Sequence, residues 1–533
     1  MSKHIRKRAM ILTIVFMISF FSCLMRVLYI QNSNYSLVAD MQFNKSITLG
    51  RTRGYIYDRN LEPLVNEEKT EKVIIQINSI TKNMLNGICD AEEIKNGLVY
   101  AINGNNTVEE SEYIKKYSHI LRYGENMLCR HIIGYTDNEL NGVAGIEKAF
   151  DRILKEAGGE IKVSFNTTAG GSVLAGEGIT LSDNNYDSPA GISLTIDKDI
   201  QAAVEKAILN SEIECGACVV MDVNSFQIIA SCSVPFYDAE NIAASVNDTG
   251  KPFLNRALSA FPAGSVFKPF IAAAAIENGW KTNEEFQCTG SYKIGSNTFT
   301  CYDRNVHGKE DLNAAIEKSC NTFFISLGLK TGAEKIISTA EGFGFGKSIR
   351  LCSTLVSDSG NIPDAASVTS DSQLANLCFG QGDIMITPVQ LAAAYSVLAN
   401  KGIYKEPSLM KELIDENKEA YAVYKSEITY RAVSESTCEI INSALYNNML
   451  NGTGMNGASD IVTSAGKTAT AQTGRYDSDG NEILCTWFAG FFPYETPEYA
   501  VVIMNENGST ASVDCAPVFK NIIEAVALSK YNR

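Results

Sequence analysis

Two side chains three positions apart, Ser265 and Lys268, form the pair in this sequence that is best suited to acyl transfer. A serine hydroxyl is a weak nucleophile and needs a base beside it. A lysine can be that base when burial or a neighbouring cation lowers its pKa. We expect a helix to begin near Ser265, which would place both side chains on one face and Pro269 in the first turn. The motif alone is common, because a capping serine followed by a surface lysine has the same pattern.

Two later motifs strengthen the interpretation. Ser-Cys-Asn stands at 319–321, and Lys-Thr-Ala-Thr stands at 467–470. The order Ser-x-x-Lys, Ser-x-Asn, Lys-Thr-small resembles the penicillin-binding proteins and serine β-lactamases. The Phe-Gly-Gln-Gly-Asp segment at 379–383 and Arg-Gly-Tyr-Ile-Tyr-Asp-Arg-Asn at 53–60 are similar to class B penicillin-binding proteins, the monofunctional peptidoglycan D,D-transpeptidases. This resemblance covers nearly the whole chain.

The resemblance implies a covalent mechanism on peptidoglycan stem peptides that end in D-Ala-D-Ala. Ser265 would attack the carbonyl between the two D-alanines, and Lys268 would accept its proton. Ser319 would relay a proton to the leaving D-alanine, while Asn321 would hold Lys268 and the substrate amide. An amine from a neighbouring stem peptide would then take the acyl group. β-Lactams would acylate the same serine as covalent inhibitors.

The resemblance also implies how the substrate is bound. Lys467 would supply positive potential, and Thr468 would hydrogen-bond the terminal carboxylate. The backbone N–H groups of Ser265 and Thr470 would form the oxyanion hole, a role worth roughly 3–4 kcal/mol per donor. Ala469 stands among the substrate-binding residues where the family usually has glycine, so a methyl group there would narrow the cleft or tilt the strand. We expect retained activity with altered β-lactam affinity, and no metal or cofactor.

The elements that must position these residues indicate an α+β fold. A strand hairpin and a helix precede the Ser-x-x-Lys segment, mainly helical sequence follows to about residue 450, and three strands and a last helix close the chain. The expected ranges are 198–209 for the first helix, which Asp197 would cap, 217–223 and 226–232 for the hairpin, 460–473, 484–492 and 499–505 for the late strands, and 516–528 for the last helix. Ahead of this domain, a charged stretch over about 91–118 is expected to be helical. This order predicts one antiparallel sheet flanked by helices beside a helical subdomain, with the active site in the cleft between them. The resemblance identifies this fold as the penicillin-binding and serine β-lactamase type.

The N-terminal sequence predicts a membrane anchor. Five basic side chains at 3–8, counting histidine, precede an apolar run over 9–30 that is long enough to cross a bilayer. The basic cluster favours a cytoplasmic N-terminus and an extracytoplasmic remainder. A cleaved signal peptide is the alternative, but bulky residues occupy 25–30, where small ones would be needed. We therefore expect a tail at 1–8, a single transmembrane anchor at 9–30, a mixed α/β pedestal or dimerisation-like module at 31–190 and the transpeptidase domain at 191–533.

Composition excludes some other classes. The chain has 46 basic and 61 acidic residues and a net charge of -15, which argues against nucleic acid as a partner. Its 14 cysteines are irregularly spaced, so they do not predict a disulfide framework. A Cys-x-x-Cys at 215–218 leads straight into an apolar strand and is interpreted as core. The 4 histidines show no ligand spacing, so we expect no His-built metal site.

Several functions remain open on the same fold. A D,D-carboxypeptidase or a β-lactamase would use the same serine, although a β-lactamase rarely carries an anchor and also needs a water activated by a carboxylate, for which no residue is evident. A dormant penicillin-binding scaffold would be expected to lose Ser265 or Lys268. By family analogy, a separate membrane glycan polymerase of the shape or division type would bind through the anchor and pedestal. The sequence does not distinguish elongation, division and sporulation.

Overall fold

The computed structural model divides the chain into two compact units. It describes residues 3–32, 43–77, 81, 92–95, 99–103, 109–168, 174, 177–424 and 428–531. The smaller unit comprises Met1–Thr52, Glu68–Arg122 and Gly158–Ser188, and the larger unit comprises Arg53–Glu67, Tyr123–Ala157 and Pro189–Arg533. The segments 53–67 and 123–157, which the sequence analysis placed in the N-terminal module, thus belong to the larger unit. The junction at 188–189 lies close to the expected boundary at 190.

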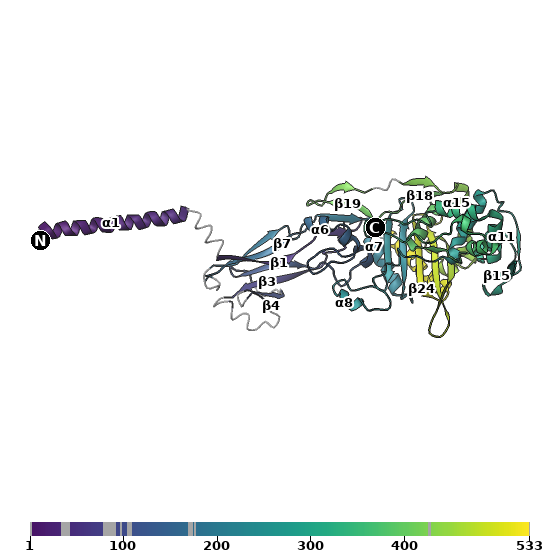
Figure 1. Cartoon of the computed structure of the whole chain (residues 1–533), viewed down its shortest axis with the longest axis horizontal. Coiled ribbons are helices and arrows are strands. Elements are labelled where there is room, and N and C mark those ends of the chain that lie inside the picture. The colour runs from purple at the N-terminus through teal and green to yellow at the C-terminus, as the bar shows by residue number, and fades with distance from the viewer. Residues whose placement is uncertain are drawn as a thin grey trace. The chain divides into compact units, whose positions relative to one another are not determined.

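The chain begins with one long apolar helix, α1 (Lys3–Asn32), seen at the N-terminal end in Figure 1. Its 30 residues correspond to about 45 Å of helix, more than the hydrocarbon core of a bilayer at about 30 Å. None of its side chains is buried in protein, although most are apolar. It is the single helix in the described part of the chain that is long and apolar enough to cross a membrane, and it contains the expected anchor at 9–30. Met1 and Ser2 of the expected tail lie outside the described residues.

The smaller unit is built from two antiparallel sheets. One has the order β1-β7-β8 and the other the order β4-β5-β3-β6. Their strands are β1 (Asn44–Arg51), β3 (Lys69–Gln76), β4 (Glu92–Lys95), β5 (Val99–Asn103), β6 (Ile114–Ile120), β7 (Glu160–Asn166) and β8 (Thr180–Asn184). Buried Ile74, Tyr117, Ile161 and Val163 contribute to one hydrophobic core.

One local prediction from the sequence was wrong. A charged helix was expected over about 91–118, whereas the described residues there form β4, β5 and most of β6. β6 pairs with β3 along its length, with Ile114 opposite Ile75. The pairing buries Ile114, Tyr117 and Ile120, and this burial outweighs the local charge pattern.

The larger unit is organised around a five-stranded antiparallel sheet in the order β11-β10-β24-β23-β22. The strands are β10 (Gly216–Asp222), β11 (Ile228–Val234), β22 (Ala465–Tyr476), β23 (Glu482–Phe492) and β24 (Tyr499–Gly508). The helices α7 (Lys198–Leu209) and α17 (Ala516–Tyr531) share a core with one face of the sheet, and α14 (Pro388–Ala399) contacts β10, β23 and β24 from the other. Asp197 caps α7 by accepting a hydrogen bond from Ile200 N, as the sequence predicted. The expected antiparallel sheet flanked by helices is confirmed.

The helical part of this unit surrounds α9 (Lys268–Glu277), whose side chains from Lys268 to Ala275 are all buried. It contacts α10 (Leu312–Glu317), α11 (Asn321–Thr331), α12 (Ala333–Gly342) and α15 (Glu435–Asn451). The remaining helices are α4 (Arg130–Ile133), α5 (Gly145–Ala149), α6 (Asp151–Glu156), α8 (Ile242–Ser245), α13 (Asp371–Cys378) and α16 (Ala511–Asp514). The short strands near α9 are β12 (Phe261–Pro262), β13 (Phe286–Cys288), β14 (Ser291–Ile294), β15 (Asn297–Thr300), β16 (Gly308–Glu310) and β17 (Met385–Ile386).

A second sheet explains why residues 53–67 belong to the larger unit. Its order is β2-β9-β19-β20, with β2 (Tyr55–Tyr57) parallel to β9 (Gly191–Leu194) and β19 (Met410–Ile414) between β9 and β20 (Ala420–Val423). A further pair joins β18 (Ile403–Lys405) to β21 (Thr429–Arg431). Strand pairing between distant segments, which sequence spacing does not show, fixes this division of the chain.

Candidate active site

The turn that carries Ser265 leads directly into the central helix. Ser265 lies in the 3-10 turn η1 (Gly264–Phe267), and Lys268 is the first residue of α9. Residues three apart eclipse one another in a 3-10 turn, so the two side chains share a face. Pro269 lies in the first turn of α9, where its missing N–H removes no helical hydrogen bond. Ser265 is partly exposed while Lys268 is buried, which places a hydroxyl at the surface above a buried amine.

Two glycines fix the position of this turn. Gly264 has a φ of 60°, and its N–H donates to Gly380 O at 2.8 Å. A Cβ on Gly380 would lie 1.9 Å from Gly264 O, so no other residue fits this crossing without backbone movement. The Phe-Gly-Gln-Gly-Asp segment at 379–383 therefore acts structurally, by holding the chain just before Ser265.

The amine of Lys268 is held by three acceptors. Lys268 Nζ donates to Ser319 O at 2.6 Å, to Asn321 Oδ1 at 2.7 Å and to Ser319 Oγ at 3.1 Å. Burial disfavours the charged form and lowers the pKa of Lys268 to about 8. An amine with this pKa is neutral often enough near neutral pH to act as a base.

The Ser-Cys-Asn motif lies where α10 and α11 meet. Ser319 has a φ of 54°, a left-handed conformation that few non-glycine residues adopt. Asn321 begins α11, and its Nδ2 donates to Thr300 O at 2.9 Å. That bond orients the amide so that Oδ1 is directed at Lys268. The sharp turn and the oriented amide together aim both motif side chains at the buried amine.

The Lys-Thr-Ala-Thr motif lies on β22, the edge strand of the five-stranded sheet. Lys467 is buried, and its Nζ donates to Thr468 O at 3.1 Å and to Thr453 Oγ1 at 3.3 Å. Burial, and secondarily the charge of Lys268, lower the pKa of Lys467 well below its ordinary value. Thr468 Oγ1 also donates to Thr453 Oγ1, at 2.7 Å. The sequence did not predict Thr453 as a site residue. The signal it offers is the place of Thr453 in the Gly-Thr-Gly segment at 452–454, between α15 and β22.

Ala469 faces the turn that holds the serine. A Cβ on Gly264 would lie 3.3 Å from Ala469 Cβ and 3.0 Å from Ala471 Cβ. Ala469 is itself buried, and the pairing of β22 with β23 shows no register shift from Ala465 to Gln472. The methyl group is therefore accommodated beneath the turn within a regular strand. Its effect on β-lactam affinity stays a prediction.

The structure joins the predicted site residues in two groups. Lys268, Ser319 and Asn321 share hydrogen bonds, and Lys467 and Thr468 meet at Thr453. The turn η1, which carries Ser265, contacts β22, which carries Thr470. Because β22 is an edge strand, alternate N–H groups along it point away from its partner strand β23. An oxyanion hole formed by Ser265 and Thr470 requires an N–H group of this kind. Within the described part of the chain, the Ser265 hydroxyl makes no hydrogen bond to Lys268 or to any other residue.

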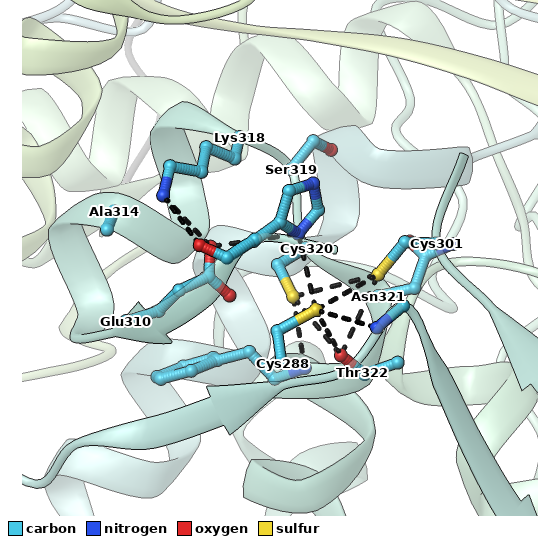
Figure 2. Close-up of polar contacts among 12 residues, drawn as sticks. Cys288, Cys301, Glu310, Ala314, Lys318, Ser319, Cys320, Asn321 and Thr322 are labelled. Atoms are coloured by element: carbon cyan, nitrogen blue, oxygen red, sulfur yellow. Dashed lines mark hydrogen bonds and ion pairs between the residues drawn. The ribbon is translucent and has the colours of Figure 1, made fainter. Parts of the chain in front are cut away.

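A set of side chains beside the site could hold a metal ion, whereas the sequence had predicted no metal. Cys288, Cys301, His307 and Cys320 each offer one donor atom, and these atoms all lie within 4.8 Å of one another. Figure 2 shows the three sulfur atoms directed toward a common centre next to Ser319 and Asn321.

Comparisons with known proteins agree with the motif order and the fold. The model of the penicillin-binding protein transpeptidase domain matches residues 216–524. Stage V sporulation protein D of Bacillus subtilis is 28% identical over 428 residues, which cover 76% of this chain and 63% of that protein. The peptidoglycan D,D-transpeptidase MrdA of Haemophilus influenzae is 27% identical over 485 residues, covering 80% of this chain and 71% of that protein. The chain thus spans less than two thirds of the first of these relatives.

The solved structures show the same fold. The D,D-transpeptidase domain of a peptidoglycan glycosyltransferase from Eggerthella lenta superposes with a TM-score of 0.67 at 24% identity, covering 90% of this chain and 99% of that one. The family model covers more than half of the chain, and the relatives include the peptidoglycan D,D-transpeptidase FtsI of Escherichia coli, 26% identical over 76% of this chain and 66% of that protein. The chain belongs to the penicillin-binding protein transpeptidase family, among the class B members that its motif order predicted.

Proposed function

We propose that this protein cross-links peptidoglycan stem peptides as a serine D,D-transpeptidase. The observation that carries the proposal is the buried Lys268 amine, which three acceptors hold one helical turn below Ser265. In the first step, Ser265 Oγ forms an ester with the penultimate D-alanine while Lys268 accepts the hydroxyl proton. The C–N bond of the peptide then breaks, and the terminal D-alanine leaves with a proton relayed through Ser319.

The second step returns the enzyme to its starting state. The amine of a neighbouring stem peptide attacks the ester carbonyl and loses a proton, and Ser265 Oγ regains one as it leaves. Asn321 would hydrogen-bond the substrate amide, and Lys467 and Thr468 would bind the terminal carboxylate. The N–H groups of Ser265 and Thr470 would stabilise the oxyanion of both tetrahedral intermediates.

β-Lactams are proposed to acylate the same serine. Penicillin-binding protein A of Mycobacterium tuberculosis, which has the same fold with a TM-score of 0.65, is known as an imipenem acyl-enzyme complex. A β-lactam presents a strained amide where the stem peptide would present its D-Ala-D-Ala peptide bond, and a carboxylate where the stem peptide would present its terminal carboxylate. The carboxylate would meet Lys467 and Thr468 on β22.

The proposed setting is the outer face of the cytoplasmic membrane. α1 would span the bilayer once, with its basic N-terminal residues in the cytoplasm. We also propose a partner of the glycan-polymerase type. One solved structure with this fold supports it, a peptidoglycan synthase complex described as coordinating polymerisation and crosslinking, with a TM-score of 0.70. The name of one relative, stage V sporulation protein D, refers to sporulation, and the names of two others refer to peptidoglycan D,D-transpeptidase activity.

Release of D-alanine from a stem pentapeptide, in the presence of an amine acceptor, tests the proposal directly. We expect the full chain in detergent to release D-alanine in step with a new peptide bond to the acceptor, and Ser265→Ala to release none. Release by hydrolysis alone, without the new bond, would favour the carboxypeptidase alternative. No turnover and no acylation by folded protein would favour the dormant scaffold.

The pH dependence of acylation should report on Lys268. The neutral amine is the base, and it predominates above its pKa of about 8, so acylation should slow by about tenfold for each pH unit well below that value. Groups that influence this amine are Lys467, Cys320, Cys301 and Glu310. Because the two lysines interact, the observed midpoint belongs to the pair. The rate constant for benzylpenicillin acylation, measured from pH 5 to 9, checks this, and a flat profile below pH 8 would contradict it.

A further inference from the structure

Four segments of the larger unit converge on one buried cluster next to the active site. Cys288 ends β13, Cys301 follows β15, His307 directly precedes β16, and Cys320 precedes α11. β13 and β16 pair with each other, which brings Cys288 opposite Gly308 and hence close to His307. All three cysteines are buried, and His307 is partly buried. The donor atoms thus come from separate loops that the fold has drawn together (Figure 2).

The distances within the cluster fit a tetrahedral metal centre. With zinc–sulfur bonds of about 2.3 Å and zinc–nitrogen bonds of about 2.0–2.1 Å, tetrahedral geometry separates two sulfurs by about 3.8 Å and a sulfur and a nitrogen by about 3.6 Å. Cys301 Sγ lies 3.8 Å from both Cys288 Sγ and Cys320 Sγ. Cys288 Sγ lies 3.5 Å from His307 Nδ1. A disulfide would require sulfurs about 2.05 Å apart.

The surroundings of the sulfurs differ from those of a buried thiol in an apolar core. The N–H of Gly290 donates to Cys288 Sγ, and the N–H of Phe323 donates to Cys320 Sγ, each at 3.4 Å. The Thr322 hydroxyl donates to Cys288 Sγ at 3.2 Å. Donors directed at sulfur support thiolates, which are the form that binds a metal.

A buried carboxylate provides an independent sign that a cation belongs here. The Glu310 side chain is fully buried, and neither of its oxygens accepts a hydrogen bond among the described residues. The nitrogen atoms closest to it among its possible ion-pair partners are His307 Nδ1 at 3.7 Å and Lys318 Nζ at 3.8 Å, both beyond hydrogen-bond distance. A buried carboxylate without donors is costly, and a divalent cation within the adjacent cluster would offset that cost.

We propose that Cys288, Cys301, His307 and Cys320 bind one zinc ion, as three thiolates and one imidazole. The three thiols release their protons on binding, and no redox change is needed. Four protein ligands fill a tetrahedral zinc and leave no position for substrate, so the site is structural. Zinc also suits a set of soft sulfur donors better than magnesium or calcium does.

The zinc site also positions the active-site loop, an extension that rests on the proposed function. Cys320 is the residue between Ser319 and Asn321, whose side chains and backbone hold Lys268. Fixing Cys320 on a metal would fix the left-handed turn at Ser319 and the start of α11. Loss of zinc should therefore slow acylation of Ser265 as well as destabilise the larger unit.

Metal analysis of the purified full chain in detergent tests the site without reference to activity. We expect about one zinc per chain by inductively coupled plasma mass spectrometry, with loss of most of it in Cys301→Ser and in His307→Ala. His307→Cys keeps four ligands and should retain zinc. Cys352→Ser is the matched control, because Cys352 is a partly buried cysteine outside the cluster and its sulfur contacts Thr354 instead.

A second measurement, on the wild-type chain, tests the site even if the variants do not fold. Replacement of the metal with Co²⁺ should give the thiolate charge-transfer and intense d–d absorption of a tetrahedral sulfur-rich site. Folded protein with less than about one tenth of a zinc per chain, iron in its place, or a Cys288–Cys301 disulfide in non-reducing peptide mapping would each overturn the proposal. A chain that holds one zinc but is not acylated would leave the metal site standing and count against the proposed function alone.

Discussion

Lys268→Met is expected to slow acylation of Ser265 by benzylpenicillin by about 10²–10⁴-fold, the usual contribution of a general base. Methionine matches the length of the lysine side chain but cannot accept a proton. The change removes three hydrogen bonds to Ser319 and Asn321, and it also removes a buried amine whose pKa burial has lowered. These two effects on stability oppose each other, so we expect thermal unfolding to shift by only a few degrees. Stopped-flow or gel-based acylation with a fluorescent penicillin measures the rate.

Two further variants separate loss of the base from loss of charge. Lys268→Arg keeps a positive charge but stays protonated at all accessible pH values, so it should not restore acylation. Lys330→Met, in the exposed last turn of α11, should acylate like the wild type. Acylation of Lys268→Met within about threefold of wild type would contradict a role as general base.

Arg53→Met is expected to destabilise the larger unit by about 3–5 kcal/mol, because it leaves the buried carboxylate of Glu147 without the Arg53 guanidinium. The Arg53 side chain is 1% exposed, and its Nε lies 2.9 Å from Oε2 of Glu147, which is 0% exposed. Its Nη1 lies 2.8 Å from Asp151 Oδ1. This ion pair joins the segment before β2 to α5 and α6.

Tryptophan fluorescence measures that loss selectively. The chain has 2 tryptophans, Trp280 and Trp487, and both lie in the larger unit. Arg51→Met is the control, since Arg51 is 68% exposed and 3.8 Å from Glu160, and such pairs contribute less than about 1 kcal/mol. Adding Glu147→Gln to Arg53→Met should recover part of the loss by removing the unpaired charge. An equal shift of the unfolding midpoint in Arg53→Met and Arg51→Met would refute the account of a buried ion pair.

Local sequence signals predicted those elements of the larger unit that are determined by neighbouring residues. The capping Asp197 and helical spacing placed α7 at its observed bounds, and alternating apolar runs placed β10, β11 and the three late strands. The signals failed where distant segments decide the structure. β6 is a strand because it pairs with β3, and residues 53–67 join the larger unit because β2 pairs with β9.

In the candidate site, too, local features were predictable from the sequence and contacts between distant segments were not. Spacing alone placed Ser265 and Lys268 on one face of a turn, and the resemblance supplied the other motifs. Neither could show that Thr453 meets both Lys467 and Thr468, because that contact joins the loop after α15 to β22. The cysteine cluster was missed for a similar reason. Its ligands come from four separate segments without a short ligand spacing, and only the pairing of β13 with β16 and the start of α11 bring them together.

The most direct test of the proposed function is the intact mass of the full chain in detergent, with and without benzylpenicillin, beside Ser265→Ala. We predict a single penicilloyl adduct on the wild type that persists for many minutes and is absent from the variant. Such persistence would also separate a transpeptidase from a β-lactamase, which would release the product. An adduct that survives Ser265→Ala, or no adduct on folded wild-type protein, would contradict Ser265 as the nucleophile.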